Sequence, residues 1–251
     1  MFFLQSPPPT RFDLRFTLFG ISVRVHPLFW IIPLLISSSS PSLTEILVWA
    51  LAVFISVLVH EMGHALAMRF YGQRSQIVLH AMGGLTIPES VAWGTGWASV
   101  ARAPNQEILI TAAGPAAGFA FAALLLTAVH ALGGMISVSF LFGFIPIPQA
   151  HFSTGILFLD MLIAALVSVN VFWGFFNLLP VYPLDGGQIA RHVLLLLDRG
   201  DGARKSLWLS VIIGGLMALA GILYFHSIFM TLMFGMMAFQ SYQMLQGAGM
   251  R

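Results

Sequence analysis

The sequence predicts an all-α polytopic membrane protein with about six transmembrane helices and a short membrane-embedded β or re-entrant segment between the second and the third. Two properties of the composition carry this prediction. Hydrophobic residues make up 58% of the chain and charged residues 8%, whereas a soluble globular domain has about a quarter charged residues. The apolar residues also gather in stretches of about 20, which is the length that crosses a bilayer as a helix.

Six stretches are apolar enough to be considered as spanning helices. The first is the shortest and contains Pro33, and the second and fourth exceed the ~20 residues that a bilayer requires. In chain order they cover residues 23–37, 43–70, 106–132, 153–179, 206–225 and 227–246. No stretch is polar enough for a separate soluble domain. We therefore expect residues 1–251 to form a single membrane-embedded domain, without a PDZ-like insertion or a C-terminal regulatory domain.

The basic residues predict the orientation in the membrane. With the N-terminus inside the cell, six crossings place all 11 Lys and Arg side chains on the cytoplasmic side or at its boundary, in agreement with the positive-inside rule. We therefore expect a multi-pass protein of the cell membrane whose N-terminal segment 1–20 and C-terminus both face the cytoplasm. The chain begins without the basic region of a signal peptide, so the first helix should act as an uncleaved insertion signal.

The composition also excludes several kinds of site. The chain has no cysteine, which excludes disulfide bonds and thiolate metal ligands. The formal net charge is only +2 and the basic residues form no stripe, so the sequence predicts no binding to nucleic acid. The lipid bilayer is the partner that the composition does predict.

Two stretches outside the predicted helices do not fit simple loops. Residues 77–96 combine β-branched residues with Gly83, Gly84 and Pro88, and they are too apolar for an ordinary cytoplasmic loop. Irregular backbone at membrane depth needs protein or a water-filled cavity around it, so we expect a re-entrant segment with some strand. Residues 180–187, which are rich in proline and glycine, should break the chain after the fourth helix.

A metal-binding motif, His60-Glu61-Met62-Gly63-His64, lies in the second predicted helix. Residues four apart lie on one face of a helix, so His60 and His64 can bind one Zn²⁺ ion together, and Glu61 is close enough to take a proton from water. His60 lies roughly 22 Å along this helix at 1.5 Å per residue. Three ionisable side chains within five residues at that depth are costly, which favours a functional role over a structural one.

A catalytic zinc site usually has three protein ligands and one open position, so a third ligand must come from elsewhere. Asp185 lies in the broken segment that enters the membrane from the same side as His60. A zinc ion would supply the counter-charge that a carboxylate at this depth requires. His80 is the alternative ligand. Other acids lie at the outer ends of helices or in cytoplasmic segments: Glu45, Asp160, Asp13, Asp198 and Asp201.

Three motifs together point to a known family. They are HEMGHA at residues 60–65, Ala113-Gly114-Pro115 behind a Gly-Gly pair, and NLLPVYPLDGG at residues 177–187. The last of these matches the pattern N-x-x-P-x-x-P-L-D-G, and the chain thereby resembles the site-2 protease family of intramembrane zinc metalloproteases. The resemblance covers about residues 20–200. One departure is Gly118, where the family often has asparagine.

The resemblance implies a role for each site residue. His60, His64 and Asp185 would bind one zinc ion per chain, and Glu61 would be the general base. Asn177 would position the substrate or stabilise the reacting carbonyl.

The resemblance also implies the substrate, namely single-pass membrane proteins that another protease has already cut. The peptide bond must be presented in extended form, because a helix hides its own carbonyl groups. Our candidate for the strand edge that pairs with such a substrate is residues 77–96 with Gly83 and Gly84, and a passive plug is the alternative.

Two other functions are the alternatives to a protease. A zinc transporter should have polar residues on both sides of the midplane. The intact Glu61 argues against an inactive relative.

Overall fold

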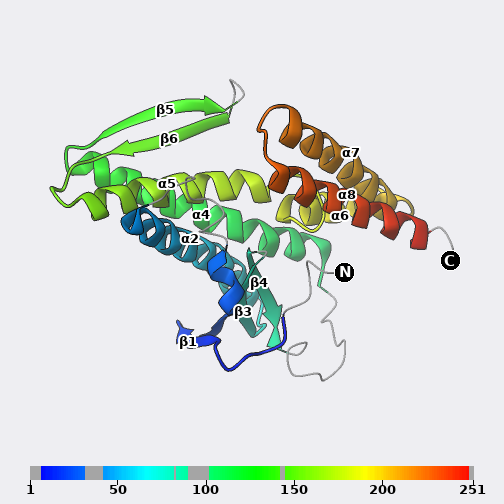
Figure 1. Ribbon diagram of the computed structural model, residues 1–251. Helices are drawn as coiled ribbons and strands as arrows, with labels where there is room; N and C mark the ends of the chain where they lie inside the picture. The colour runs from blue at the N-terminus through cyan, green and yellow to red at the C-terminus, as the bar shows by residue number, and fades with distance from the viewer. Residues whose placement is uncertain (1–6, 32–41, 82, 90–101, 142–144, 249–251) are drawn as a thin grey trace. The chain divides into compact units, whose positions relative to one another are not determined.

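The computed structural model describes residues 7–31, 42–81, 83–89, 102–141 and 145–248 (Figure 1). Five helices in these ranges are long and apolar enough to cross a membrane. They are α2 (Leu43–Phe70), α4 (Pro104–Ala131), α5 (Leu157–Asn177), α7 (Gly202–Leu223) and α8 (Ile228–Ala248). They match the second to sixth predicted helices within a few residues, which confirms a polytopic membrane protein.

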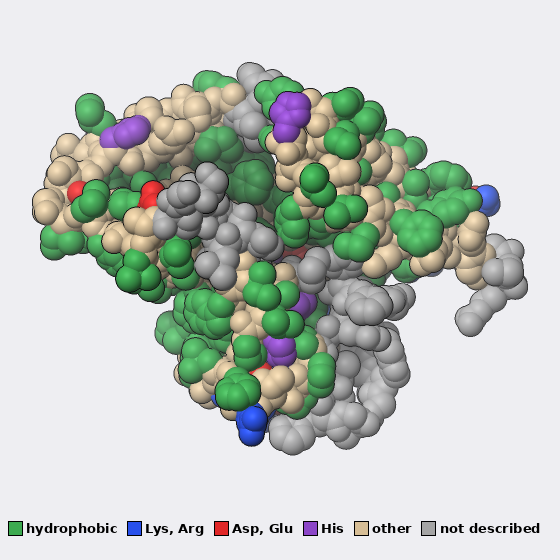
Figure 2. Space-filling view, in the orientation of Figure 1, with side chains coloured by type: hydrophobic (Ala, Val, Ile, Leu, Met, Phe, Trp, Pro, Cys, Tyr) green, Lys and Arg blue, Asp and Glu red, His purple; other side chains and the backbone are tan. Residues whose placement is uncertain are grey.

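The surface is apolar, as a membrane protein requires. Figure 2 shows hydrophobic side chains over much of the visible face, with few charged ones. On α7, Leu216, Leu219 and Ile222 are each more than half exposed. Contiguous apolar surface of this kind is rare on soluble monomers and marks contact with lipid or protein.

The first predicted helix, over residues 23–37, is wrong in its first residues. Ile21–Val25 is strand β2, and Pro27–Trp30 is a short 3-10 helix, η1. Side chains in β2 alternate between buried and more exposed positions, which is the period of a strand and not of a helix. Residues 32–37 lie outside the described residues, so six helices are not confirmed.

The structure contains two β-sheets, so the fold is not all-α. β1 (Leu14–Leu18), β2, β3 (Ser75–His80) and β4 (Gly83–Pro88) form one sheet in that order, in which β2 and β3 run parallel and the other pairs antiparallel. The strand expected within residues 77–96 is therefore present, although residues 90–96 lie outside the described residues and a re-entrant path is not confirmed. A separate antiparallel hairpin, β5 (Met135–Leu141) and β6 (Ile145–His151), was not predicted.

The chain divides into two compact units. The first unit contains both sheets, α2, and most of α4 and α5. Its core lies where alternate side chains of β2 pack with Val53 and Val57 of α2. A polar contact joins α5 to α2, because Asn170 Nδ2 donates to Ser56 Oγ and to the Leu166 carbonyl, both at 2.8 Å.

The second unit is built on α6 (Asp185–Leu197), α7 and α8. Small residues let α7 and α8 approach closely. A Cβ atom added to Gly221 would lie 2.8 Å from Thr231 Oγ1, and one added to Gly214 would lie 3.1 Å from Ala238 Cβ. Val181, Phe234 and Met237 form the buried core of this unit.

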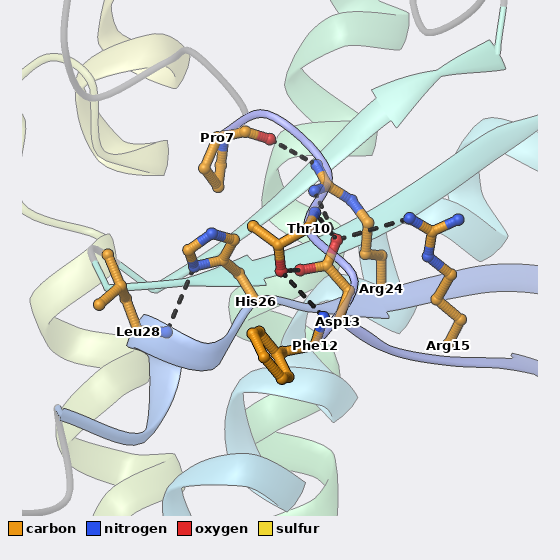
Figure 3. A network of polar contacts seen from close by, with 8 residues as sticks. All are labelled: Pro7, Thr10, Phe12, Asp13, Arg15, Arg24, His26 and Leu28. Atoms are coloured by element: carbon orange, nitrogen blue, oxygen red, sulfur yellow. Dashed lines mark hydrogen bonds and ion pairs between the residues drawn. The ribbon is translucent and has the colours of Figure 1, made fainter.

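Asp13 fastens the N-terminal segment to β2 (Figure 3). Its carboxylate accepts hydrogen bonds from Thr10 N at 3.0 Å, Thr10 Oγ1 at 2.7 Å and Arg24 Nη1 at 3.2 Å. Burial raises the pKa of Asp13, but the hydrogen bonds from Thr10 and the charge of Arg24 outweigh it and lower the pKa from 3.8 to about 2. Asp13 is therefore ionised whenever this segment is folded at neutral pH.

This network predicts acid sensitivity. A carboxyl group whose pKa is lowered by folding stabilises the fold above its unfolded pKa, and that stabilisation is lost as the pH falls from about 4 towards about 2. Asp13→Asn should therefore lower the melting temperature at pH 7 and weaken its decrease between pH 4 and pH 2. Thermal unfolding in detergent at several pH values measures this. Asp201→Asn is the control, and equal melting temperatures for Asp13→Asn and the parent chain at pH 7 would contradict the prediction.

Candidate metal centre

His60 and His64 lie one helical turn apart in the half of α2 that packs against the sheet. Both side chains are buried, and their Nε2 atoms are 3.2 Å apart with the ring planes at 81°. Two ligand atoms bound to tetrahedral zinc at ~2.05 Å would be separated by ~3.3 Å. The two imidazoles are therefore already spaced as neighbouring ligands of one zinc ion.

Glycine residues make room for these rings where α4 packs against α2. A Cβ atom on Gly114 would collide with the His64 ring, and a Cβ atom on Gly63 would collide with the Ala113 carbonyl. Any larger residue at either position would force the helices apart or push His64 aside. Gly114 of the Gly-Pro pair at residues 114–115 thus leaves the space that the His64 ring occupies.

Glu61 faces β4. Thr86 Oγ1 donates a hydrogen bond to Glu61 Oε2 at 2.7 Å and contacts the Glu61 carbonyl at 3.1 Å. A Cβ atom on Gly84 would lie 2.6 Å from the carboxyl carbon of Glu61. Gly83 has φ 118°, a conformation that favours glycine. Gly84 therefore lies where β4 passes close to Glu61, whereas a Cβ atom on Gly83 would lie 3.2 Å from the Trp173 ring.

Thr86 is the residue that sequence reasoning missed. No motif contains it, and its relation to Glu61 depends on the packing of a strand against a helix. The alternation of a strand offered a signal, because residues two apart, such as Gly84 and Thr86, lie on the same face of β4.

Asp185 is the first residue of α6, and its side chain is buried. A Cβ atom on Gly186 would collide with the Leu178 carbonyl, and one on Gly187 would collide with Tyr182 N. The same Tyr182 N donates to Ser210 Oγ of α7 at 3.0 Å. The backbone of the proline-rich segment before Asp185 is thus tightly packed against the start of α6.

The structure brings His60, His64 and Asp185 together. Each offers one ligand atom, and these atoms all lie within 4.8 Å of one another. Two imidazoles and one carboxylate, all buried, are a donor set that zinc enzymes use while leaving a fourth position open. Within the described part of the chain, His80 does not belong to this group. It is buried at the end of β3.

The acids set aside as ligands have other partners. Glu45 forms a capping box with Ser42 at the start of α2, with Ser42 N donating to Glu45 Oε2 at 2.7 Å. Asp160 accepts two hydrogen bonds from Thr154, and Asp198 accepts one from Lys205 at 2.6 Å. Asn177 is buried as the last residue of α5, and its role in catalysis stays a prediction.

Comparison with known proteins agrees with this geometry. Residues 48–221, more than half of the chain, match the family model of peptidase family M50. A zinc metalloprotease of Methanocaldococcus jannaschii is 27% identical over 214 residues, covering 83% of this chain and 52% of that protein. A protein of Synechocystis sp. that carries the name of zinc metalloprotease is 28% identical, over 80% of this chain and 51% of that protein. Another with this name, from Mycobacterium tuberculosis, is 30% identical, over 63% of this chain and 33% of that protein.

The chain therefore spans about half, or less, of the length of these curated relatives. A solved structure, the site-2 protease from Methanocaldococcus jannaschii, is similar along its whole length. It is 25% identical, with a TM-score of 0.55, and the similarity covers 93% of this chain and 95% of that chain.

Proposed function

We propose that this chain, which belongs to peptidase family M50 and to its site-2 protease group, is a zinc metalloprotease of the membrane. Its substrates would be single-pass membrane proteins, cut within or near the transmembrane segment after a first cut by another protease. The observation that carries the proposal is the buried group of His60, His64 and Asp185 with Glu61 beside it.

His60, His64 and Asp185 would hold the zinc ion. Zinc, when bound, would lower the pKa of a water molecule and polarise the carbonyl group of the scissile peptide. Glu61 would take the proton from the attacking water and deliver it to the leaving amine. The hydrogen bond from Thr86 orients the Glu61 carboxylate for both transfers.

Strand β4 is suited to present the substrate. It is the last strand of its sheet, and within the described residues no further strand pairs with its outer edge. An extended peptide added to this edge would gain backbone hydrogen bonds. It would also lie beside Glu61, because Thr86 of the same strand contacts that side chain.

The direct test is cleavage by the purified chain in detergent or nanodiscs. A single-pass substrate that has lost its outer domain should be cut, a chelator should stop the reaction, and added zinc should restore it. The site of the cut, read by mass spectrometry, should fall within or next to the transmembrane segment. Full activity after zinc has been removed, with the loss confirmed by metal analysis, would refute the proposed chemistry.

The glycine beside Glu61 gives a steric prediction. Gly84→Ala would place a methyl group 2.6 Å from the Glu61 carboxyl carbon, so the carboxylate must move. Displacing a catalytic group by about 1 Å can cost about a hundredfold in rate, and we expect kcat to fall by that order while zinc content is unchanged. Gly215→Ala is the matched control, because a Cβ atom there would have no neighbour within 4 Å. Equal kcat for the two variants would show that the close contact between Gly84 and Glu61 does not matter for the rate.

Both termini would face the cytoplasm if the chain crosses an even number of times. Arg69, near the end of α2, donates to the Phe19 carbonyl at 2.7 Å, and Phe29 of η1 packs on Phe54 at 6.2 Å. Ser42 caps the opposite end of α2. From Phe19 to Phe29 the chain therefore runs antiparallel to α2, a helix of about 42 Å. A crossing between Phe29 and Ser42 would add to the five helices and make six.

The orientation predicts the behaviour of fused reporters. A reporter that works only in the cytoplasm should be active when fused after Arg251 and inactive when inserted within residues 37–40. An outward-active reporter should show the opposite pattern at the same two positions. If the cytoplasmic reporter worked only at residues 37–40, the metal centre would belong to the outer leaflet, and the proposed orientation would be wrong.

A further inference from the structure

We infer that the outer edge of strand β5 is a second binding site for extended polypeptide, which takes a segment of the membrane-protein substrate away from the scissile bond. This inference rests on the proposed function. It concerns a hairpin, β5–β6, that contributes no residue to the metal centre.

Prolines close one edge of this hairpin. Pro146 and Pro148 of β6 lie opposite Phe140 and Val138 of β5. Proline has no N–H group, so within a paired strand it occupies positions whose N–H would point away from the partner. The outward side of β6 is thereby left with a donor only at Ala150, which is buried at the base of the hairpin. Another strand cannot pair well with this edge.

The same register leaves peptide groups on the outer edge of β5 without partners from β6. Antiparallel pairs alternate between positions that exchange hydrogen bonds and positions whose peptide groups point outward. Phe140 and Val138 lie opposite the prolines and therefore point their N–H and C=O groups outward, as does Ile136 opposite Ala150. None of the three is a proline or a charged residue, which are the usual protections of an edge. Within the described residues, β5 pairs with no strand but β6.

The hairpin lies in an uncharged part of the sequence. It joins α4 to α5, and residues 108–159 contain no Asp, Glu, Lys or Arg. The base is packed on the helices, where Ala150 is 8% exposed, but exposure rises to 41% at Ile136, 51% at Val138 and 61% at Phe140. Figure 1 shows the hairpin extending along α5. Where lipid surrounds such an edge, peptide groups that lack partners are strongly disfavoured.

Polar side chains of the hairpin are already paired with each other. Ser137 Oγ lies 2.7 Å from His151 Nε2, and Gln149 Nε2 donates to Ser139 Oγ at 3.3 Å. What remains available is a row of alternating peptide donors and acceptors. This row matches the backbone of an extended polypeptide, whereas an ion or a lipid headgroup would match it at one point only.

The variant that tests the inference is Val138→Pro. It removes one outward N–H and leaves the bonds between β5 and β6 in place, whereas the control Val138→Ala removes the side chain and keeps the N–H. With a full-length single-pass substrate, we expect Val138→Pro to raise KM by about fivefold to tenfold, which is the order of one lost hydrogen bond, with kcat nearly unchanged. Val138→Ala should change KM by less than about twofold.

A short peptide substrate shows whether the variant is folded. A peptide that reaches only the metal centre should be cleaved equally well by the parent chain and by Val138→Pro. If Val138→Pro cleaves that peptide normally and also keeps the parent KM for the full-length substrate, the inference is overturned while the proposed protease function stands. If the parent chain cleaves neither substrate with zinc bound, it is the proposed function that fails.

Cross-linking identifies the occupant. The chain has no cysteine, so Val138→Cys in a Glu61→Gln background places one thiol at the edge. A disulfide with a cysteine in the substrate, confined to one short segment of it, supports the inference. A disulfide between two copies of Val138→Cys that forms regardless of substrate would assign the edge to self-association and overturn it.

Discussion

Glu61→Gln should bind zinc as the parent chain does and cleave its substrate at least about a hundred times more slowly. Glutamine has nearly the shape of glutamate, and its amide oxygen can still accept the hydrogen bond that Thr86 donates to Glu61. The buried group of His60, His64 and Asp185 keeps all three ligand atoms. What the variant lacks is a group that takes a proton from water at neutral pH.

Two measurements on the same purified sample check this prediction. Metal analysis should give the same zinc content for Glu61→Gln and the parent chain, and a cleavage assay should give the loss of rate. Glu45→Gln is the matched control on the same helix, because Glu45 serves only to cap the start of α2. Wild-type turnover by Glu61→Gln would remove Glu61 from the role of general base.

Asp185→Ala should lose zinc and activity together. The variant leaves two imidazoles where three ligands are needed, and we expect the affinity for zinc to fall by more than about a hundredfold, beyond the loss typical of outer-shell changes. Asp185→Asn should show the same direction, because a neutral amide is a poorer ligand than a carboxylate. Gly186 and Gly187 keep the local backbone packed in both variants.

The control for this prediction is Asp160→Asn. Asp160 also lies in the first turn of a helix, but its carboxylate accepts hydrogen bonds from Thr154, and its replacement should change neither zinc content nor rate. Competition with a chelator of known affinity measures the first quantity. Stoichiometric zinc of unchanged affinity in Asp185→Ala would show that another residue is the third ligand, and His80 would be tested next.

The grouping of His60, His64 and Asp185 was predictable because its signals are strong. The spacing of four residues places His60 and His64 on one helical face whatever the tertiary structure. Asp185 was predictable by membrane depth, since the apolar helices are long enough to show which acids lie at which end. Partners for Glu45 and Asp160 at the ends of their helices agree with that elimination.

The strands were harder to predict, for a physical reason. The run from Ile21 to Leu35 is mostly apolar, with Ser22, Arg24 and His26 as its polar residues, and hydropathy alone cannot distinguish a short buried strand from part of a spanning helix. Only the five residues of β2 carry the alternation that identifies it. The contact between Thr86 and Glu61 depends on how β4 packs against α2, which no local pattern specifies.

The parallel pairing of β2 with β3 has a consequence for biogenesis. Parallel neighbours need a crossover connection, and here that crossover contains the whole of α2. β2 is synthesised before α2 and β3, so it can pair with β3 only after the whole of α2 has been synthesised. Asp185 is synthesised later still. If Asp185 completes the zinc site as proposed, peptide hydrolysis would begin only after synthesis has passed residue 185, and a nascent chain that ends before it would have no protease activity.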